Sequence, residues 1–319
     1  MSNLEEHSDT RPAVWMISAA VCFSTMVALT HALGSRCDWL TIALVRASVM
    51  FVSSVAIARL AGAKLVFSRP RTLWMRSFAG SFSLVCSFYA STRLPVGDFI
   101  TLSNTYPLWI VVLASLVGKQ APTAGDGLRI ALALAGVALI GRPSLSGDNF
   151  GAAIALLGSV STAVAMIGLH RLREVDSRAV VAHFSGVATV IAGTWFLLRG
   201  PGGGALVGAV SGANPSLLGA DPVTWLMLLG VAICGTVGQL FLTRAYASGA
   251  PARVSVLGLS QVIFGLGFDV LLWHRAMSPA TLAGMVLVVA PTAWLLAHPG
   301  VVPSAEEIPL TVVPNPGES

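Results

Sequence analysis

Long apolar stretches recur along the whole of this 319-residue chain, and they decide what the chain can fold into. Hydrophobic residues make up 55% of the sequence and charged residues 10%, with a mean hydropathy of +0.79. A helix of about 20 apolar residues crosses the hydrocarbon core of a bilayer. Because lipid satisfies no open strand edge, the stretches predict an all-α membrane protein with transmembrane helices. We identify ten of them, at residues 13–33, 39–59, 73–92, 96–118, 127–141, 150–170, 179–198, 223–243, 254–273 and 279–297.

Lysine and arginine residues indicate how the predicted spans cross the membrane. With the N-terminus inside, most of the nineteen basic residues fall on the inner side, Arg76 among them. The outer side receives only Arg36, Arg93, Arg142, Arg199 and Arg275. Basic residues gather in cytoplasmic loops, which also accounts for the net charge of +5 without a nucleic-acid partner. We predict a multi-pass protein of the cell membrane with both termini in the cytoplasm, where residues 1–12 and 298–319 are disordered.

The ten spans divide into two sets of five, and short sequence echoes relate the two sets. Residues 89–91 and 246–248 both read Tyr-Ala-Ser, in a chain with three tyrosines. With one gap allowed, this alignment then places Asn104 opposite Ser260. An odd number of spans turns the second copy upside down relative to the first, which is a transporter architecture. The sequence therefore predicts two inverted five-helix repeats, at residues 13–141 and 150–297.

Several short motifs are similar to those of a known transporter family. They are Leu-Val-Arg-Ala at 44–47, Leu-Pro-Val-Gly at 94–97, Tyr-Pro-Leu-Trp at 106–109, Gly-Gln-Leu at 238–240, Thr-Arg-Ala-Tyr at 243–246 and Ser-Gln-Val at 260–262. In their order and spacing, the chain resembles the EamA-type permeases of the drug/metabolite transporter superfamily over residues 13–297. The resemblance implies two five-helix repeats and export of a small polar or amphipathic metabolite. One departure is that the fourth and ninth spans, which commonly end in Gly-Glu in the family, end here in Gly118-Lys119 and His274-Arg275.

Polar side chains inside apolar spans are the candidate substrate-binding residues. Arg46 lies within the second span, where an unpaired charge costs about 3 kcal/mol or more, so it either anchors an anionic group or satisfies helix carbonyls. Asn104 and Tyr106 lie half-way along the fourth span, and Gln261 lies at a similar depth in the ninth. Gln239 lies in the eighth span. These side chains either line a pocket at the repeat interface or only join helices by hydrogen bonds.

The predicted function is transport by alternating access, and the chain is not predicted to be an enzyme. The expected partners are a small-molecule substrate and the lipid bilayer, with no cofactor and no metal; a homodimer is one of the open oligomeric states. Two alternatives remain. An intramembrane enzyme would be expected to show a motif such as HExxH or a carboxylate pair, which the sequence lacks. A scaffold subunit would have no need of polar residues in mid-span.

Overall fold

Helices account for all of the regular structure in the described part of the chain. The computed structural model describes residues 10–34, 36–37, 39–67, 70–93, 99, 102–118, 124–141, 149–199, 221–249, 251–274 and 278–297. The helices are α1 (Arg11–Leu33), α2 (Trp39–Leu60), α3 (Arg71–Arg93), α5 (Tyr106–Gly118), α6 (Ala124–Gly141), α7 (Asn149–His170), α8 (Ser177–Arg199), α10 (Pro222–Ser248), α11 (Pro251–Gly258), α12 (Ser260–Trp273) and α13 (Pro279–Ala297). The all-α prediction is confirmed. The two ends predicted to be disordered lie largely outside these residues, as do Lys119 and Arg275.

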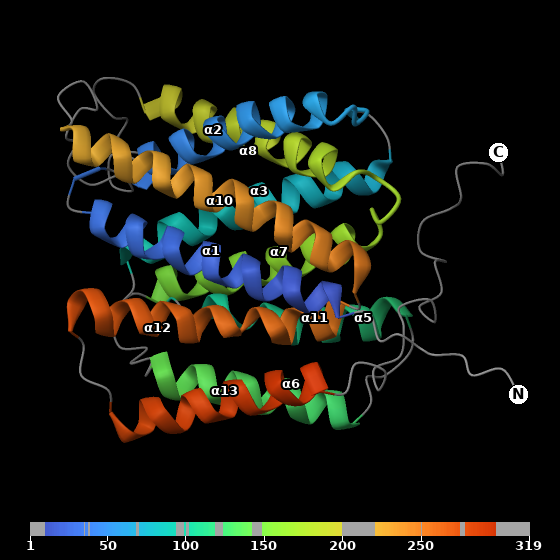
Figure 1. The fold of residues 1–319 in the computed structure, drawn as a ribbon, viewed down its shortest axis with the longest axis vertical. Helices are drawn as coiled ribbons and strands as arrows, with labels where there is room; N and C mark the ends of the chain where they lie inside the picture. Colours follow the sequence, from blue (N-terminus) through green and yellow to red (C-terminus); the bar gives the residue numbers. More distant parts are fainter. Residues whose placement is uncertain are drawn as a thin grey trace, which may run out of the picture.

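The helices pack in two layers, which can be followed in Figure 1. In the first layer, α2 packs on α10, α10 on α1, and α1 on α11 and α12, which in turn contact α13. In the second layer, α8 packs on α3, α3 on α7, α7 on α5, and α5 on α6. The layers are joined at their two edges, where α2 packs on α8 and α6 packs on α13. Each layer therefore mixes helices from the first and the second half of the sequence.

Two neighbouring contacts show that α1 and α7 run in opposite directions. A Cβ atom placed on Gly249, just after α10, would lie 2.9 Å from Cβ of Pro12 at the start of α1. The ring Nδ1 of His170 at the end of α7 lies 3.0 Å from the carbonyl oxygen of Tyr246 near the end of α10. The beginning of α1 and the end of α7 therefore share one face of the bundle. We call this face the terminal face, because α1 begins there, and we call the other end the opposite face.

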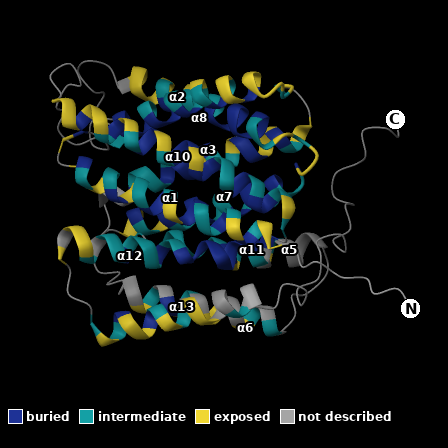
Figure 2. Cartoon of the chain, viewed as in Figure 1, coloured by how far each residue is buried: buried dark blue, intermediate teal, exposed yellow. Residues whose placement is uncertain are grey.

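Exposed residues lie along the outside of the bundle, as the yellow segments in Figure 2 show, and many of them have large apolar side chains. Leu60, Leu197, Leu271, Val190 and Leu226 are between 69% and 89% exposed. Among the described residues, six helical segments are long and apolar enough to cross a membrane, namely α1, α2, α7, α8, α10 and Arg253–Leu272. Such an apolar exterior suits lipid and not water. The count of ten spans in two repeats stays a prediction.

Two predicted spans differ from single helices, because each is interrupted in its middle. In the fourth, Asn104 and Thr105 form a turn before α5 begins at Tyr106, and in the ninth Leu259 separates α11 from α12. Proline at position 107 lacks the N–H that would continue the helix from Ser103. In the ninth span, Ser260 Oγ donates to the carbonyl of Leu257 at 2.7 Å, a bond that competes with helical pairing.

The hydrogen bonds at the two interruptions match each other. The N–H of Thr105 donates to Leu102 O at 3.2 Å, and the N–H of Leu259 donates to Val256 O at 3.1 Å. The next bonds run from Leu108 to Thr105 and from Val262 to Leu259, both at 3.0 Å. The residue numbers differ by 154 in each pair (259 − 105 and 262 − 108). By this pattern, Gly258 in the second half of the chain corresponds to Asn104 in the first half. The sequence alignment instead pairs Asn104 with Ser260, two positions later.

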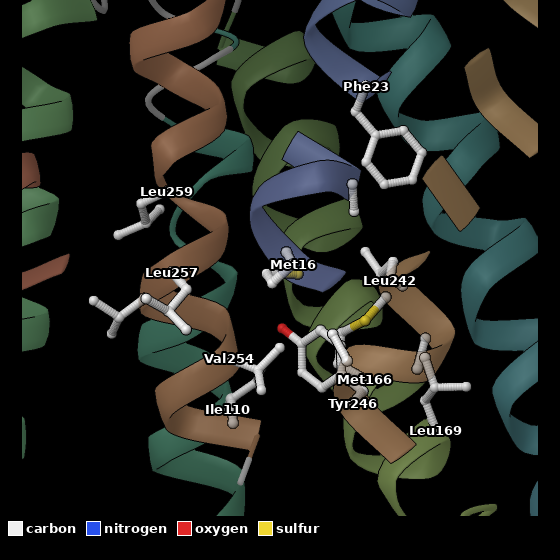
Figure 3. Packing of buried hydrophobic residues seen from close by; sticks show 14 of the residues in the cluster. Met16, Phe23, Ile110, Met166, Leu169, Leu242, Tyr246, Val254, Leu257 and Leu259 are labelled. Atoms are coloured by element: carbon white, nitrogen blue, oxygen red, sulfur yellow. The ribbon is translucent and has the colours of Figure 1, made fainter. Parts of the chain in front are cut away.

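The largest buried apolar cluster lies toward the terminal face and joins both layers (Figure 3). It contains Met16 of α1, Tyr246 of α10 and Leu257 of α11 from the first layer. The second layer contributes Ile110 of α5 and Leu169 of α7. Toward the opposite face the buried clusters are smaller. One comprises Leu33, Cys37, Ile42, Leu228 and Val231 from the first layer, with Phe88 of α3 packed against it, and another comprises Ala90 and Ala155 from the second layer. A further cluster joins the layers along the α2–α8 edge; it contains Ala43, Ala47 and Met50 of α2, Leu84 of α3, and Val181, Phe184 and Ala188 of α8.

An ion pair at the opposite face holds the start of α10 beside the end of α1. Asp221 is the N-cap of α10, and its carboxylate accepts hydrogen bonds from the N–H and the hydroxyl of Thr224. Arg36 Nη1 lies 3.1 Å from Asp221 Oδ2. The Thr224 hydroxyl bond, with smaller effects from the Thr224 N–H and Arg36, holds the pKa of Asp221 below its usual value of 3.8.

We expect Asp221→Asn to lower the melting temperature of the protein at neutral pH and not at strongly acidic pH. A carboxyl whose pKa is lower in the folded state stabilises the fold above its unfolded pKa, and this contribution is lost as the pH falls through the folded pKa. Melting curves of the purified wild type and variant between pH 3 and pH 7 test this. The difference in melting temperature between wild type and variant should disappear below about pH 4. A difference that is constant over the whole range would contradict the assignment.

Candidate functional site

Arg46 of α2 is buried against α1 and α10 in the middle of the bundle. Its side chain is 7% exposed. A Cβ atom on Gly235 of α10 would lie 2.8 Å from Arg46 Nε and 3.2 Å from Met26 Sδ of α1, so glycine at 235 leaves the room that the guanidinium fills. Arg46 Nε has no hydrogen-bond partner among the described residues. A buried polar nitrogen left in this way is costly, so it needs an explanation.

Gln239 lies one turn along α10 from Gly235, on the same face of that helix. Its side chain is 6% exposed, and its amide nitrogen Nε2 has no hydrogen-bond partner among the described residues. Residues four apart on a helix are neighbours on its surface. The structure therefore brings together two of the predicted site residues, Arg46 and Gln239, each with an unused donor.

Tyr106 is the first residue of α5 and reaches across to the other layer. Its hydroxyl donates to the carbonyl of Ser255 in α11 at 3.5 Å, a long bond. A Cβ atom on Gly258 would lie 2.7 Å from the same hydroxyl and would also meet Met16 Cε. The hydroxyl of Tyr246, buried beside Met16 and Val254 in Figure 3, has no well-formed partner among the described residues. The two helix interruptions thus meet at Tyr106, toward the terminal face.

Asn104 lies at the interruption of the fourth span, and Gln261 lies at the interruption of the ninth span. Asn104 is half-buried in the turn that precedes α5. Gln261 is half-buried in the first turn of α12, and its backbone carbonyl accepts a bond from Ser24 Oγ of α1 at 2.8 Å. The predicted site residues therefore fall into two groups. One holds Arg46 and Gln239 beside Met26 of α1, and the other holds Tyr106 beside Gly258 and Met16 of α1. Asn104 and Gln261 border the helix interruptions.

Arg76 is a second buried arginine, and the sequence analysis misplaced it among the charges of the inner surface. It is 1% exposed, and its guanidinium carbon lies 4.2 Å from the centre of the Phe184 ring of α8. Gly80 leaves room for the guanidinium, and Gly168 of α7 for its stem. The Arg76 Nε and Nη1 atoms have no hydrogen-bond partner among the described residues. The available signal was that Arg76 falls inside the predicted span 73–92 and not in a loop.

His183 lies next to Arg76 and acts as a packing residue. Its Nδ1 lies 2.7 Å from Ser77 Oγ, and its Nε2 lies 3.2 Å from the carbonyl oxygen of Phe67. The carbonyl needs an N–H, so the proton is assigned to Nε2 and Nδ1 accepts from the serine hydroxyl. Trp74 packs edge-on against the ring at 4.6 Å. Both ring nitrogens are therefore used in contacts within the protein.

Comparison with known proteins shows a similarity to transporters. Residues 10–142 match the model of the EamA-like transporter family. The pseudopaline exporter CntI of Pseudomonas aeruginosa is 26% identical over 275 residues, which cover 86% of this chain and 91% of that protein. Residues 10–142 are therefore an EamA-like domain, and relatives that match most of the chain are named as transporters. An uncharacterized transporter of Helicobacter pylori is 24% identical over 75% of this chain and 77% of its own length.

A solved crystal structure has the same fold as this chain. The two superpose with a TM-score of 0.72 at 18% sequence identity, over 88% of this chain and 96% of the other. At that identity the likeness concerns the fold alone. The matched family segment lies in the first half of the chain and contains Arg46, Asn104 and Tyr106, whereas Gln239 and Gln261 lie beyond it. Within the described residues, no group of His, Cys, Asp or Glu side chains is placed to hold a metal ion.

Proposed function

We propose that this protein exports a small polar or amphipathic metabolite across the cell membrane by alternating access. The observation that carries the proposal is the distribution of the buried core. The largest cluster joins the two layers toward the terminal face, and a second cluster joins them along the α2–α8 edge. In the smaller clusters toward the opposite face the buried residues come from one layer each, and only the partly buried Phe88 of α3 packs against the first-layer cluster. A transporter closed on one side and able to open on the other requires such an asymmetry. The relative named as an exporter supports the direction.

The helix contacts support two inverted repeats. If the two repeats are equivalent, α1 corresponds to α7 and α3 corresponds to α10. The contact between α1 and α10 then has its counterpart in the contact between α7 and α3. With α2 matched to α8, α5 to α12 and α6 to α13, the α1–α12 contact corresponds to α5–α7, and the α2–α10 contact to α8–α3. The α2–α8 and α6–α13 contacts each correspond to themselves. The opposite directions of α1 and α7 and the matched interruptions agree with this correspondence. In this proposal the two layers, each built from helices of both repeats, rock about a shared site near the middle of the membrane.

The proposed substrate site comprises Arg46, Asn104, Tyr106, Gln239 and Gln261. Interrupted helices at corresponding places in two repeats mark the binding site of many transporters, because unpaired backbone groups and polar side chains gather there. Here, Asn104 and Tyr106 border one interruption and Gln261 borders the other. Arg46 and Gln239 add the unpartnered donors between α2 and α10.

We expect Asn104→Ala and Gln261→Ala to lower transport with little change in melting temperature. The measurement is flux of isotope-labelled metabolites, fractionated from cells, into and out of proteoliposomes that hold the purified protein. If these side chains bind substrate, flux per folded molecule falls. If they only join helices, each change costs about 0.6 kcal/mol of stability and leaves flux per folded molecule unchanged. A wild-type protein that moves no fraction would refute the transport proposal itself.

The proposed orientation places the terminal face in the cytoplasm, because most basic residues would then face inward. A membrane-impermeant thiol reagent on intact cells tests this in a variant that lacks the four native cysteines. We expect Gly34→Cys, at the end of α1 on the opposite face, to react from outside. Ala61→Cys, in the exposed turn after α2, should react only after permeabilisation. The reverse pattern would invert the assignment.

A further inference from the structure

Arg46 and Gln239 together point to the chemical class of the substrate, and this inference rests on the proposed transport function. Both side chains are more than nine-tenths buried, and both present an unused N–H donor. No carboxylate among the described residues pairs with Arg46; the described ion pairs are Arg36–Asp221 and Arg178–Asp176. A guanidinium buried without an anion is unfavourable, so a site of this kind is completed by the molecule that it binds.

The position of the guanidinium suits a transported ligand. Gly235, which faces Arg46 Nε, is the middle residue of α10, since Pro222 and Ser248 are each thirteen residues away. Arg46 lies in the first third of α2, which begins at the opposite face. The guanidinium therefore lies at mid-depth, beyond the cluster that closes the terminal face.

Arg76 shows what a structural arginine looks like in the same protein. Its guanidinium rests on the face of Phe184, a favourable cation–π contact, and it lies near the start of α3 within the closed half. Arg46 has no comparable contact with a ring among the described residues. The comparison separates an arginine that packs from one that remains available.

We propose that Arg46, assisted by Gln239, binds a carboxylate group of the transported substrate. A guanidinium offers two parallel N–H donors that match the two oxygens of a carboxylate. The amide Nε2 of Gln239 supplies a further donor one turn away. One buried positive charge is neutralised by one carboxylate, whereas a phosphate with about 1.5 to 2 negative charges would leave an excess in the membrane interior. The substrate class is therefore a carboxylic acid metabolite, including amino-acid-like compounds.

The test compares carboxylates with the corresponding amides, which lack the carboxylate charge, on the purified full-length protein. Melting temperature is measured with succinate and succinamide, histidine and histidinamide, and citrate, and with spermidine and inorganic phosphate as probes of other charge. We expect a carboxylate to raise the melting temperature more than its amide does. Arg46→Met should weaken the affinity for that carboxylate about 10- to 100-fold. Arg46→Lys, which keeps the charge but loses the paired donors, should recover part of it.

Arg76→Met is the matched control. It should lower the melting temperature without ligand, because it removes a buried contact, yet preserve the preference for carboxylate over amide. The proposal is overturned if no carboxylate exceeds its amide, if phosphate or spermidine is preferred, or if Arg46→Met keeps the preference. Flux in proteoliposomes separates carboxylate recognition from transport itself. If wild type moves solutes and Arg46→Met carries carboxylates as well as wild type does, transport stands and carboxylate recognition fails.

Discussion

Cross-linking the two layers at the terminal face is expected to reduce transport to background. We choose His170→Cys at the end of α7 and Ser248→Cys at the end of α10, in a variant without the native cysteines. His170 lies 3.0 Å from the carbonyl oxygen of Tyr246, two residues before Ser248, so a short bifunctional thiol reagent can bridge the pair. Alternating access requires this face to open. A reagent that contains a disulfide allows the bridge to be cut, and cutting it should restore transport.

A cross-link within one layer provides the control. Arg36→Cys and Asp221→Cys lie at the opposite face, where the native side chains are 3.1 Å apart, and both belong to the layer that contains α1 and α10. We expect this bridge to leave transport largely intact, since the layers still separate. Flux in proteoliposomes before and after reduction is the measurement. Full transport by the bridged His170–Ser248 pair would show that the terminal face does not open.

Replacing Gly158 by leucine is expected to destabilise the bundle strongly. Gly158 of α7 faces α3, and a Cβ atom there would lie 2.9 Å from Cβ of Cys86. That atom is fixed to the backbone of α3, so it cannot rotate away and the helices must separate. Separation also strains the bond from Ser161 Oγ to the carbonyl of Ala79, 2.8 Å long. Overpacking at such a contact costs about 3 kcal/mol.

Gly265→Leu is the matched control for this prediction. Gly265 lies in α12, and no atom lies within 4 Å of the place where its Cβ would be. Both variants add the same side chain to an apolar helix, so they differ in packing alone. Melting temperature and yield in the membrane fraction should fall for Gly158→Leu and stay near wild type for Gly265→Leu. Equal losses would show that the close contact between α3 and α7 is not a major source of stability.

Hydropathy predicted most helices of the described chain because it is a local property. The predicted stretches 13–33, 39–59 and 279–297 agree with α1, α2 and α13 to within two residues. The eighth stretch ended too early, since α10 continues past the charged Arg244 to Ser248. The Arg244 guanidinium lies 5.2 Å from the centre of the Trp15 ring, so a neighbouring helix accommodates the charge. A window along the sequence contains no information on that neighbour.

The candidate site divides in the same way. Arg46 and Gln239 stood out because a charge or an amide is unfavourable among apolar residues wherever the chain goes. The sequence did not show that these two side chains share one place between α2 and α10, which depends on Gly235 facing Arg46. Nor did it show that Tyr106 bridges the two helix interruptions, because the partner carbonyl is that of Ser255, 149 residues away.

By itself, the sequence determined that this protein is a helical membrane protein, that polar groups would lie inside the bilayer, and that its motifs resemble those of the EamA family. The reason is that the length and polarity of each segment decide its free energy in lipid. Only the tertiary structure decided that Arg76 is buried on Phe184, and that the largest core cluster joins the two layers toward one face. Both depend on which helices meet, and that is set by the packing of residues far apart in the chain.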